Sequence, residues 1–215
     1  MSNRKLAVFD LDGTLNRTEL YAVPAHHMTL LELGFPDRSD EDIISVFGAR
    51  AQESVEFLTG RGEPDFVADY MRRSGGHEQE LIRDHAASFE GVPEMLRRLK
   101  EMGYDTAICS NSSERYIRMV LGALDILPWI DYIQPLMPDL TKEGTLRLLL
   151  ERVNPPAAVM VGDRFYDKEA AKANGIPFVG CLYGFCPDEV RDGDAAVQSA
   201  AELPDAIDAL LPSGK

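Results

Sequence analysis

The chain has 215 residues, of which 45% are hydrophobic and 27% charged, and this composition is typical of a globular protein and excludes extensive disorder. Its net charge of −14 would repel a phosphate backbone, so we expect no nucleic-acid partner. A membrane span needs an apolar run of ~18 residues, which the sequence lacks, so we expect no membrane partner. Three cysteines do not suit a disulfide-stapled secreted scaffold, so we expect a cytoplasmic protein with free thiols.

The first predicted element is a strand that ends in two carboxylates. Leu6 to Phe9 are four successive apolar residues, a pattern that indicates a strand buried on both faces. Asp10 and Asp12 follow this strand. At a separation of about 5 Å and an effective dielectric constant of about 20, two such charges would repel by about 3 kcal/mol. A bound cation is the obvious means of offsetting this repulsion.

The sequence from residue 16 to residue 87 has the pattern of helices and contains no further strand. The predicted helices are Pro24–Leu33, Asp40–Phe47, Gln52–Leu58, Asp65–Arg73 and Glu78–Ala87. Such a segment would form a small helical bundle, inserted at the edge of the sheet where ligands bind in open α/β folds. We expect His26 and His27 to be surface residues, because neighbours on a helix face different ways.

Strands and helices then alternate from residue 93 to residue 180. The predicted strands are Asp105–Cys109, Asp131–Leu136, Ala157–Gly162 and Ile176–Gly180. The predicted helices are Pro93–Met102, Glu114–Leu124, Lys142–Val153 and Asp167–Asn174, with a serine cap before the second and Thr141 as a cap for the third. This alternation predicts a parallel sheet with helices on both faces.

Polar residues follow the strands of this sheet. Ser110 and Asn111 come after the second strand, and Asp163 and Asp167 come after the fourth, while Lys142 opens a helix between them. Because the carboxyl ends of parallel strands meet at one edge, we expect these side chains to share a site with the carboxylates of the first strand. Oxygen ligands at this density favour Mg²⁺, and a metal that also contacts substrate oxygens points to phosphate.

Carboxylates in this arrangement can perform phosphoryl transfer. An aspartate that attacks phosphorus forms an aspartyl phosphate, which is an established covalent route. A second carboxylate two residues further on can protonate the departing oxygen and later deprotonate water, a contribution of ~10²- to 10⁴-fold.

Four motifs in chain order carry a resemblance to a known family. They are DLDGTL from Asp10, the Ser110-Asn111 pair, Lys142, and GDRFYD from Gly162 to Asp167. Together they resemble the haloacid dehalogenase superfamily phosphatases, and the insertion is similar in position and length to the helical cap of the phosphoglycolate phosphatase and β-phosphoglucomutase branch. The resemblance implies an α/β fold with a Rossmann-like three-layer core at residues 1–15 and 88–215 and a helical cap domain at residues 16–87.

The resemblance also implies a role for each motif residue. Asp10 would be the nucleophile and Asp12 the acid and base. Mg²⁺ would be held by the Asp10 side chain, the Asp12 backbone carbonyl and Asp163, and Asp167 would hold either a water molecule of the metal or Lys142. Lys142 would neutralise the nucleophile and the transferring phosphoryl group.

Substrate contacts are implied at three further positions. The Ser110 hydroxyl and the Asn111 backbone N–H would bind the phosphoryl group. Arg50, in the sequence FGAR between two cap helices, would recognise a second anionic group of the substrate.

Lys142 departs from the family pattern, since the family often has Lys-Pro there and this chain has Lys142-Glu143.

The leading hypothesis is a Mg²⁺-dependent phosphatase that hydrolyses a small phosphorylated metabolite. A sugar-phosphate mutase, which would pass the phosphoryl group to a substrate instead of to water, has the same motifs and stays open. A dehalogenase is disfavoured, because its chemistry has no leaving oxygen for Asp12 to protonate. A receiver-like phosphorylation-sensing module would also be doubly wound and acidic, but the helical insertion argues against it. The sequence predicts neither the physiological substrate nor the oligomeric state.

Overall fold

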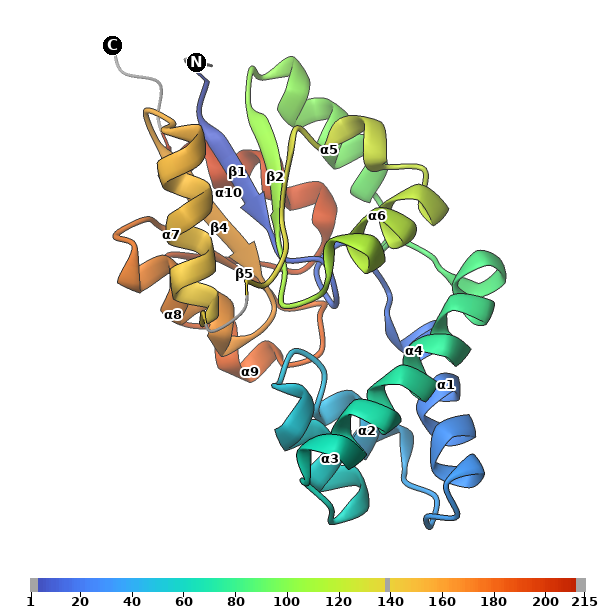
Figure 1. The fold of residues 1–215 in the computed structure, drawn as a ribbon. Helices are drawn as coiled ribbons and strands as arrows, with labels where there is room; N and C mark the ends of the chain where they lie inside the picture. The colour runs from blue at the N-terminus through green and yellow to red at the C-terminus, as the bar shows by residue number, and fades with distance from the viewer. Residues whose placement is uncertain (1–3, 138–139, 212–215) are drawn as a thin grey trace. The chain divides into compact units, whose positions relative to one another are not determined.

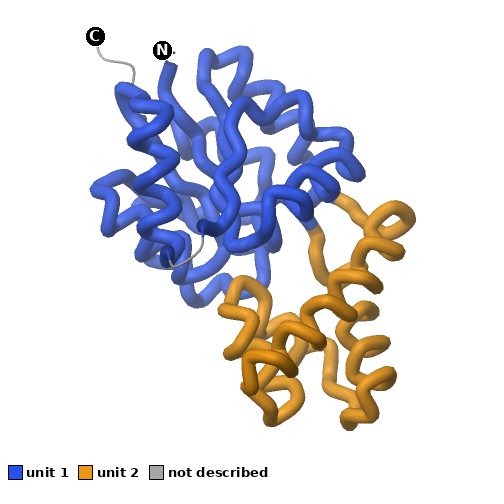
Figure 2. The backbone as a smooth tube through the Cα atoms, in the orientation of Figure 1, with its two compact units in different colours: residues 1–16, 88–215 blue, residues 17–87 orange. Residues whose placement is uncertain are grey.

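A six-stranded parallel sheet organises the first of two compact units into which the chain divides (Figures 1 and 2). Our computed structural model describes residues 4–137 and 140–211. The first unit comprises residues 1–16 and 88–215, and the second comprises residues 17–87.

The strands of the first unit are short and follow an order typical of doubly wound folds. They are β1 Leu6–Phe9, β2 Asp105–Cys109, β3 Tyr132–Gln134, β4 Ala158–Gly162, β5 Phe178–Cys181 and β6 Ala195–Val197. Their order across the sheet is β3-β2-β1-β4-β5-β6, and all pairs are parallel. The chain runs outward from β1 in one direction to β3 and then returns to β4 on the other side. The carboxyl ends of β1 and its neighbours therefore form the switch point at which ligands bind in such sheets.

Helices cover both faces of the sheet. They are α5 Val92–Glu101, α6 Glu114–Ala123, α7 Lys142–Val153, α8 Phe165–Ala173, α9 Pro187–Val190 and α10 Leu203–Leu210, with 3₁₀ turns η1 Leu127–Trp129 and η2 Ala200–Glu202. Leu6 and Val8 of β1 lie in a core with Leu146 and Leu149 of α7, and Ala170 of α8 belongs to the same core. Helices α5 and α10 pack against each other on the opposite face (Figure 1). The alternating α/β architecture expected from the sequence is confirmed.

The second unit is entirely helical in its regular structure. Its helices are α1 Glu19–Glu32, α2 Asp40–Ser45, α3 Ala51–Thr59 and α4 Pro64–His85. Helix α4 packs against α1 and α3, and α1 also contacts α2. Tyr21, Leu30, Val55 and Tyr70 are fully buried within this bundle. The predicted insertion of helices between the first and second strands is confirmed.

The largest differences from the prediction in this unit concern two helices. Helix α1 begins at Glu19, so Pro24 lies inside it and not at its start. Residues 64–85 form one helix, although the predicted helices stopped at Arg73 and resumed at Glu78. Each glycine at positions 75 and 76 costs about 1 kcal/mol of helix propensity. The buried side chains of Tyr70 and Ile82 lie on either side of these glycines, and packing against the bundle outweighs that cost.

The sheet also departs from the prediction in its details. Strand β3 is confined to Tyr132–Gln134, and β5 starts two residues later than predicted, at Phe178. Strand β6 was missed altogether, because Ala195–Val197 is only three residues long and too short to show a strand pattern. Its pairing with β5 is set by the neighbouring strand and not by its own pattern.

Candidate active site

The register of the central strands determines which residues leave the sheet together. Phe9 of β1 pairs with Ile108 of β2 on one side and with Val161 of β4 on the other. The Asp10 backbone N–H donates to the Val161 carbonyl at 2.9 Å, which continues the ladder by one residue. The residues that emerge at this edge are Asp10, Ser110 and Asp163. Sequence reasoning placed all three after strands at one edge of the sheet, and the register shows in addition that these strands are neighbours.

Three buried carboxylates converge at this edge. Asp10, Asp163 and Asp167 each offer one oxygen, and these oxygens all lie within 4.8 Å of one another. Lys142, at the start of α7, places its Nζ 2.7 Å from Asp10 Oδ1 and 2.5 Å from Asp167 Oδ1. All four side chains are buried. When every group is ionised, one ammonium therefore faces three carboxylates, and the cluster carries an excess of negative charge.

Burial and mutual repulsion shift the protonation of these groups. Burial raises the pKa of Asp163 well above its ordinary value, and the charges of Asp10 and Asp167 raise it further. Burial also raises the pKa of Asp167 to about 6, although Lys142 opposes this shift. For Lys142, burial lowers the pKa of the ammonium, but Asp10 and Asp167 raise it overall. The cluster thus lacks positive charge, and its donors are hard oxygen atoms, so the residues present fit a divalent cation such as Mg²⁺.

Asp163 is held by groups that the sequence did not single out. The Thr14 hydroxyl donates to Asp163 Oδ1 at 3.2 Å, and the Phe185 backbone N–H donates to Oδ2 at 2.8 Å. Gly13 adopts a φ of +82°, and a Cβ at this position would lie 2.3 Å from Asp163 Oδ2. Thr14 belongs to the DLDGTL motif, so its place in that motif was a signal that could have indicated a role at the site. Phe185 lies in the loop after β5, and nothing in its sequence indicates this contact.

Asp167 is fixed by the start of α8. The Arg164 backbone N–H donates to Asp167 Oδ2 at 3.1 Å, so the carboxylate caps its own helix. The Arg164 side chain is buried and its Nε donates to Glu189 Oε2 at 3.0 Å. The Phe165 backbone N–H donates to the same Glu189 oxygen at 3.0 Å. Glu189 of α9 thereby ties down the loop that carries Asp163 and Asp167.

The Asp12 side chain is not part of the carboxylate cluster. It is half-buried, and its Oδ1 accepts hydrogen bonds from Tyr116 Oη at 2.9 Å and from Asn16 Nδ2 at 3.0 Å. Its Oδ2 lies 3.4 Å from the Ser112 hydroxyl. The implied metal contact of Asp12 runs through its backbone carbonyl and stays a prediction.

The implied phosphate-binding residues lie in the turn between β2 and α6. Ser110 is buried, and its hydroxyl oxygen accepts from the Ser112 backbone N–H at 3.2 Å, so its own hydrogen can still be donated. Asn111 follows and is half-buried. The Ser113 hydroxyl accepts from the Tyr116 backbone N–H at 3.3 Å, which confirms the predicted serine cap of this helix. By contrast, Thr141 stands at the N-cap of α7 without a side-chain cap bond.

Arg50 lies in the second unit, exposed at the N-cap position of α3. Its role in substrate binding stays a prediction.

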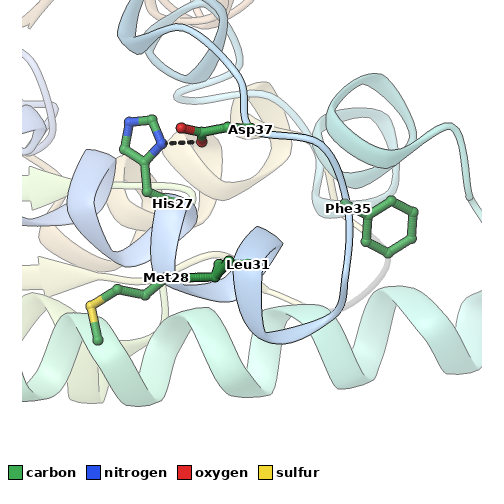
Figure 3. A pocket seen from close by; sticks show the side chains of 5 residues that line it. All are labelled: His27, Met28, Leu31, Phe35 and Asp37. Carbon is green, nitrogen blue, oxygen red and sulfur yellow. Dashed lines mark hydrogen bonds and ion pairs between the residues drawn. The ribbon is translucent and has the colours of Figure 1, made fainter.

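The two neighbouring histidines of α1 have opposite environments. His26 was expected at the surface, but it is buried and its Nδ1 lies 2.9 Å from the Tyr70 hydroxyl. Burial lowers the pKa of His26 to about 4, and the neighbouring His27 adds to this shift. His27 bridges two carboxylates, with Nδ1 2.5 Å from Asp37 and Nε2 2.8 Å from Asp40. His27 and Asp37 line a pocket of about 260 Å³ in the second unit (Figure 3).

Comparison with known proteins assigns the chain to a family. A model of the haloacid dehalogenase-like hydrolase family matches residues 7–181. A phosphoglycolate phosphatase from Thiobacillus denitrificans is 32% identical over 218 residues, which cover 92% of this chain and 93% of the relative. One from Nitrosospira multiformis is 33% identical over 202 residues, which cover 87% and 86%. A haloacid dehalogenase-like hydrolase structure from Streptococcus pneumoniae superposes with a TM-score of 0.86 at 20% identity, over 96% of this chain and 100% of that one.

The chain therefore belongs to the haloacid dehalogenase-like hydrolase family, in its phosphoglycolate phosphatase-like branch. It is a phosphatase, that is, a phosphoric monoester hydrolase, and a phosphorylated small molecule is its class of substrate. Over the part of the chain that the structure describes, none of the helices combines the length and the apolar character that crossing a bilayer requires.

Proposed function

We propose that this protein is a Mg²⁺-dependent phosphatase that hydrolyses a small phosphorylated metabolite through an aspartyl phosphate on Asp10. The observation that carries the proposal is the buried cluster of Asp10, Asp163 and Asp167 with Lys142 bound to Asp10 at 2.7 Å. Packing alone does not favour three carboxylates within 4.8 Å of one another, because each would be more stable in water.

The metal would be held by the side chains of Asp10 and Asp163 and by the backbone carbonyl of Asp12. Asp167, at 2.5 Å from Lys142, would complete the site by positioning that ammonium. When bound, Mg²⁺ would neutralise the charge of the phosphoryl oxygens and of the nucleophile.

The residues of the first unit divide the reaction into two steps. In the first, a carboxylate oxygen of Asp10 attacks phosphorus, the bond from phosphorus to the ester oxygen breaks, and Asp12 gives a proton to that departing oxygen. In the second, Asp12 takes a proton from water as the water attacks phosphorus, which releases inorganic phosphate and regenerates Asp10. Lys142 stabilises the charge on Asp10 and on the phosphoryl group, and the Ser110 hydroxyl and Asn111 N–H bind the phosphoryl oxygens.

The names of the relatives suggest the first substrate to test. Two relatives, at 32% and 33% identity, are named phosphoglycolate phosphatases. For this reason we propose 2-phosphoglycolate, a small phosphorylated carboxylic acid, as the substrate. We propose that the second unit acts as a cap and that Arg50 receives the carboxylate of such a substrate. The cytoplasmic location and the absence of nucleic-acid and membrane partners stay predictions of the sequence.

The test replaces the nucleophile by its uncharged isostere. Asp10→Asn should reduce phosphate release from 2-phosphoglycolate in Mg²⁺ to background, while the protein remains folded. The matched control is Asp105→Asn, since Asp105 is equally buried at the opposite end of the sheet, where β2 begins. Phosphate release that survives Asp10→Asn would refute the assignment.

Product analysis in the same assay separates the alternative reaction. A sugar-phosphate mutase would convert a sugar monophosphate into its isomer in the presence of a bisphosphate primer, without stoichiometric release of phosphate.

A further inference from the structure

We propose that Tyr116 is a positioning residue for the acid and base Asp12, and this inference rests on the proposed function. Tyr116 Oη donates to Asp12 Oδ1 at 2.9 Å, a normal length for a hydroxyl-to-carboxylate hydrogen bond. Neither the motif DLDGTL nor the spacing of the four motifs points to this tyrosine.

The tyrosine is itself held in place by local structure. It lies in the first turn of α6, whose start is fixed by the Ser113 cap, because Ser113 Oγ accepts from the Tyr116 backbone N–H at 3.3 Å. The next residue, Ile117, is fully buried and anchors the helix to the core of the first unit. The hydroxyl therefore approaches Asp12 from a rigid element and not from a loop.

The contacts of Asp12 divide its two oxygens. Oδ1 accepts from both Tyr116 Oη and Asn16 Nδ2, at 2.9 Å and 3.0 Å. Oδ2 has a longer contact, 3.4 Å, with the Ser112 hydroxyl. Two short hydrogen bonds on Oδ1 orient the carboxyl group, and we assign proton transfer to the other oxygen, Oδ2. Tyr116 thus directs Oδ2 toward the leaving oxygen.

The type of donor also suits an acid and base. Lys142 pairs with Asp10 and Asp167 as a full positive charge, whereas Tyr116 and Asn16 are neutral donors. The hydrogen bonds from Tyr116 and Asn16 therefore fix the direction of the Asp12 side chain without adding a positive charge of their own. This arrangement separates the nucleophile from the proton carrier, although they are two residues apart in sequence.

The experiment compares two leaving groups. An alkyl phosphate such as 2-phosphoglycolate needs a proton on its departing oxygen, whereas 2,4-dinitrophenyl phosphate leaves without one. The parameter kcat/KM reports the steps up to the first transfer to Asp10. Tyr116→Phe should therefore lower kcat/KM for the alkyl ester by about tenfold or more, the effect of losing one hydrogen bond to a charged group, and for the dinitrophenyl ester by less than about twofold.

The control is Tyr104→Phe. Tyr104 Oη also donates to a carboxylate oxygen, Asp208 Oδ1, at 2.9 Å. It accepts a hydrogen bond from Lys5 Nζ, and Lys5 precedes the amino end of β1, the end opposite Asp12. This variant should leave both kcat/KM values unchanged. The fluorescence of Trp129, the single tryptophan, checks that each variant remains folded.

Asp12→Asn separates the failure of this inference from the failure of the proposed function. Suppose that Asp12→Asn shows the leaving-group selectivity, while Tyr116→Phe either lowers both kcat/KM values equally or leaves both unchanged. Tyr116 then has no positioning role, and the proposed function stands. If Asp12→Asn itself shows no selectivity, the acid role of Asp12 and this inference fall together. Selectivity in both variants, with none in Tyr104→Phe, supports the inference.

Discussion

Replacing Asp163 by asparagine should stabilise the metal-free protein and abolish its stabilisation by Mg²⁺. Asp163 is fully buried beside two other carboxylates, Asp10 and Asp167. Asparagine has nearly the same shape as aspartate. Its side-chain oxygen can accept the hydrogen bond that the Phe185 backbone N–H donates to Asp163 Oδ2 at 2.8 Å. Its amide group would then face the Thr14 hydroxyl, which can accept a hydrogen bond as readily as it donates one. The substitution therefore removes an ionisable group without leaving a buried polar side chain unpaired.

The magnitude follows from the geometry of the cluster. Two carboxylate charges within 4.8 Å of each other repel by about 3 kcal/mol or more at an effective dielectric constant of about 20. Asp163 has two such neighbours, but Lys142 offsets part of this repulsion, and the raised pKa of Asp163 offsets more by favouring its protonated form. We therefore expect a gain of about 2 kcal/mol in EDTA, which is a rise in Tm of about 4 to 8 °C for a chain of this size.

Addition of Mg²⁺ should reverse the order of stability. A ligand at 100 times its Kd stabilises the folded state by about 2.7 kcal/mol, and the wild-type protein should gain this amount. Asp163→Asn should gain little, because one of the proposed metal ligands would have lost its charge. Trp129 lies in the first unit and is the single tryptophan, so its fluorescence follows the unfolding of the unit that carries the cluster.

The control for this experiment is Asp188→Asn, since the Asp188 side chain is 90% exposed in the same unit. It should leave both the Tm in EDTA and the response to Mg²⁺ unchanged. A lower Tm for Asp163→Asn in EDTA, together with a wild-type response to Mg²⁺, would refute the electrostatic reasoning.

Two further predictions concern backbone conformation and pH. Gly13→Ala and Gly103→Ala both force alanine into a positive φ, at a cost of about 1 kcal/mol each, but Gly13→Ala alone drives a Cβ to 2.3 Å from Asp163 Oδ2. Mg²⁺-dependent turnover should therefore be lost in Gly13→Ala and kept in Gly103→Ala, and equal activities would contradict the crowding. His26 has a pKa lowered to about 4, so it does not reduce the free energy of unfolding above pH 6.5. As the pH drops from 6.5 to 4, the unfolded state gains the proton first, and the free energy of unfolding should fall by about 3 kcal/mol. Urea unfolding followed by circular dichroism should show this slope, and His26→Gln should flatten it.

The strand-end part of the site could be predicted because parallel strands align their carboxyl ends. Once Leu6–Phe9 and Ala158–Gly162 are assigned as adjacent strands, the next residue of each, Asp10 and Asp163, must emerge at the same edge. The contact of Lys142 with Asp10 spans 132 residues of sequence and depends on where α7 packs. The sequence alone offered Lys142 only as the opening residue of a helix, and the family resemblance supplied its expected role.

Contacts fixed by tertiary packing could not be predicted in the same way. His26 and His27 are adjacent on α1, and the expectation that both are exposed failed because Tyr70, 44 residues further on, receives the His26 ring. Local propensity also broke the predicted helix at Gly75 and Gly76, whereas burial on the α1 side keeps α4 continuous. In both cases the deciding partner lies on another helix of the second unit.

The pair of aspartates at the end of β1 illustrates the limit of reasoning from sequence. Two carboxylates two residues apart would face the same side of an extended strand and repel each other. The chain does not stay extended after Asp10, because the Leu11 carbonyl accepts from the N–H groups of Leu15 and Asn16 at 3.0 Å and 2.9 Å. This turn carries the Asp12 side chain to Tyr116, while Asp10 remains with Lys142. The repulsion between Asp10 and the other carboxylates of the cluster therefore arises between strands, and the turn gives Asp12 a separate environment, which supports the proposed role of Asp12 as the proton carrier.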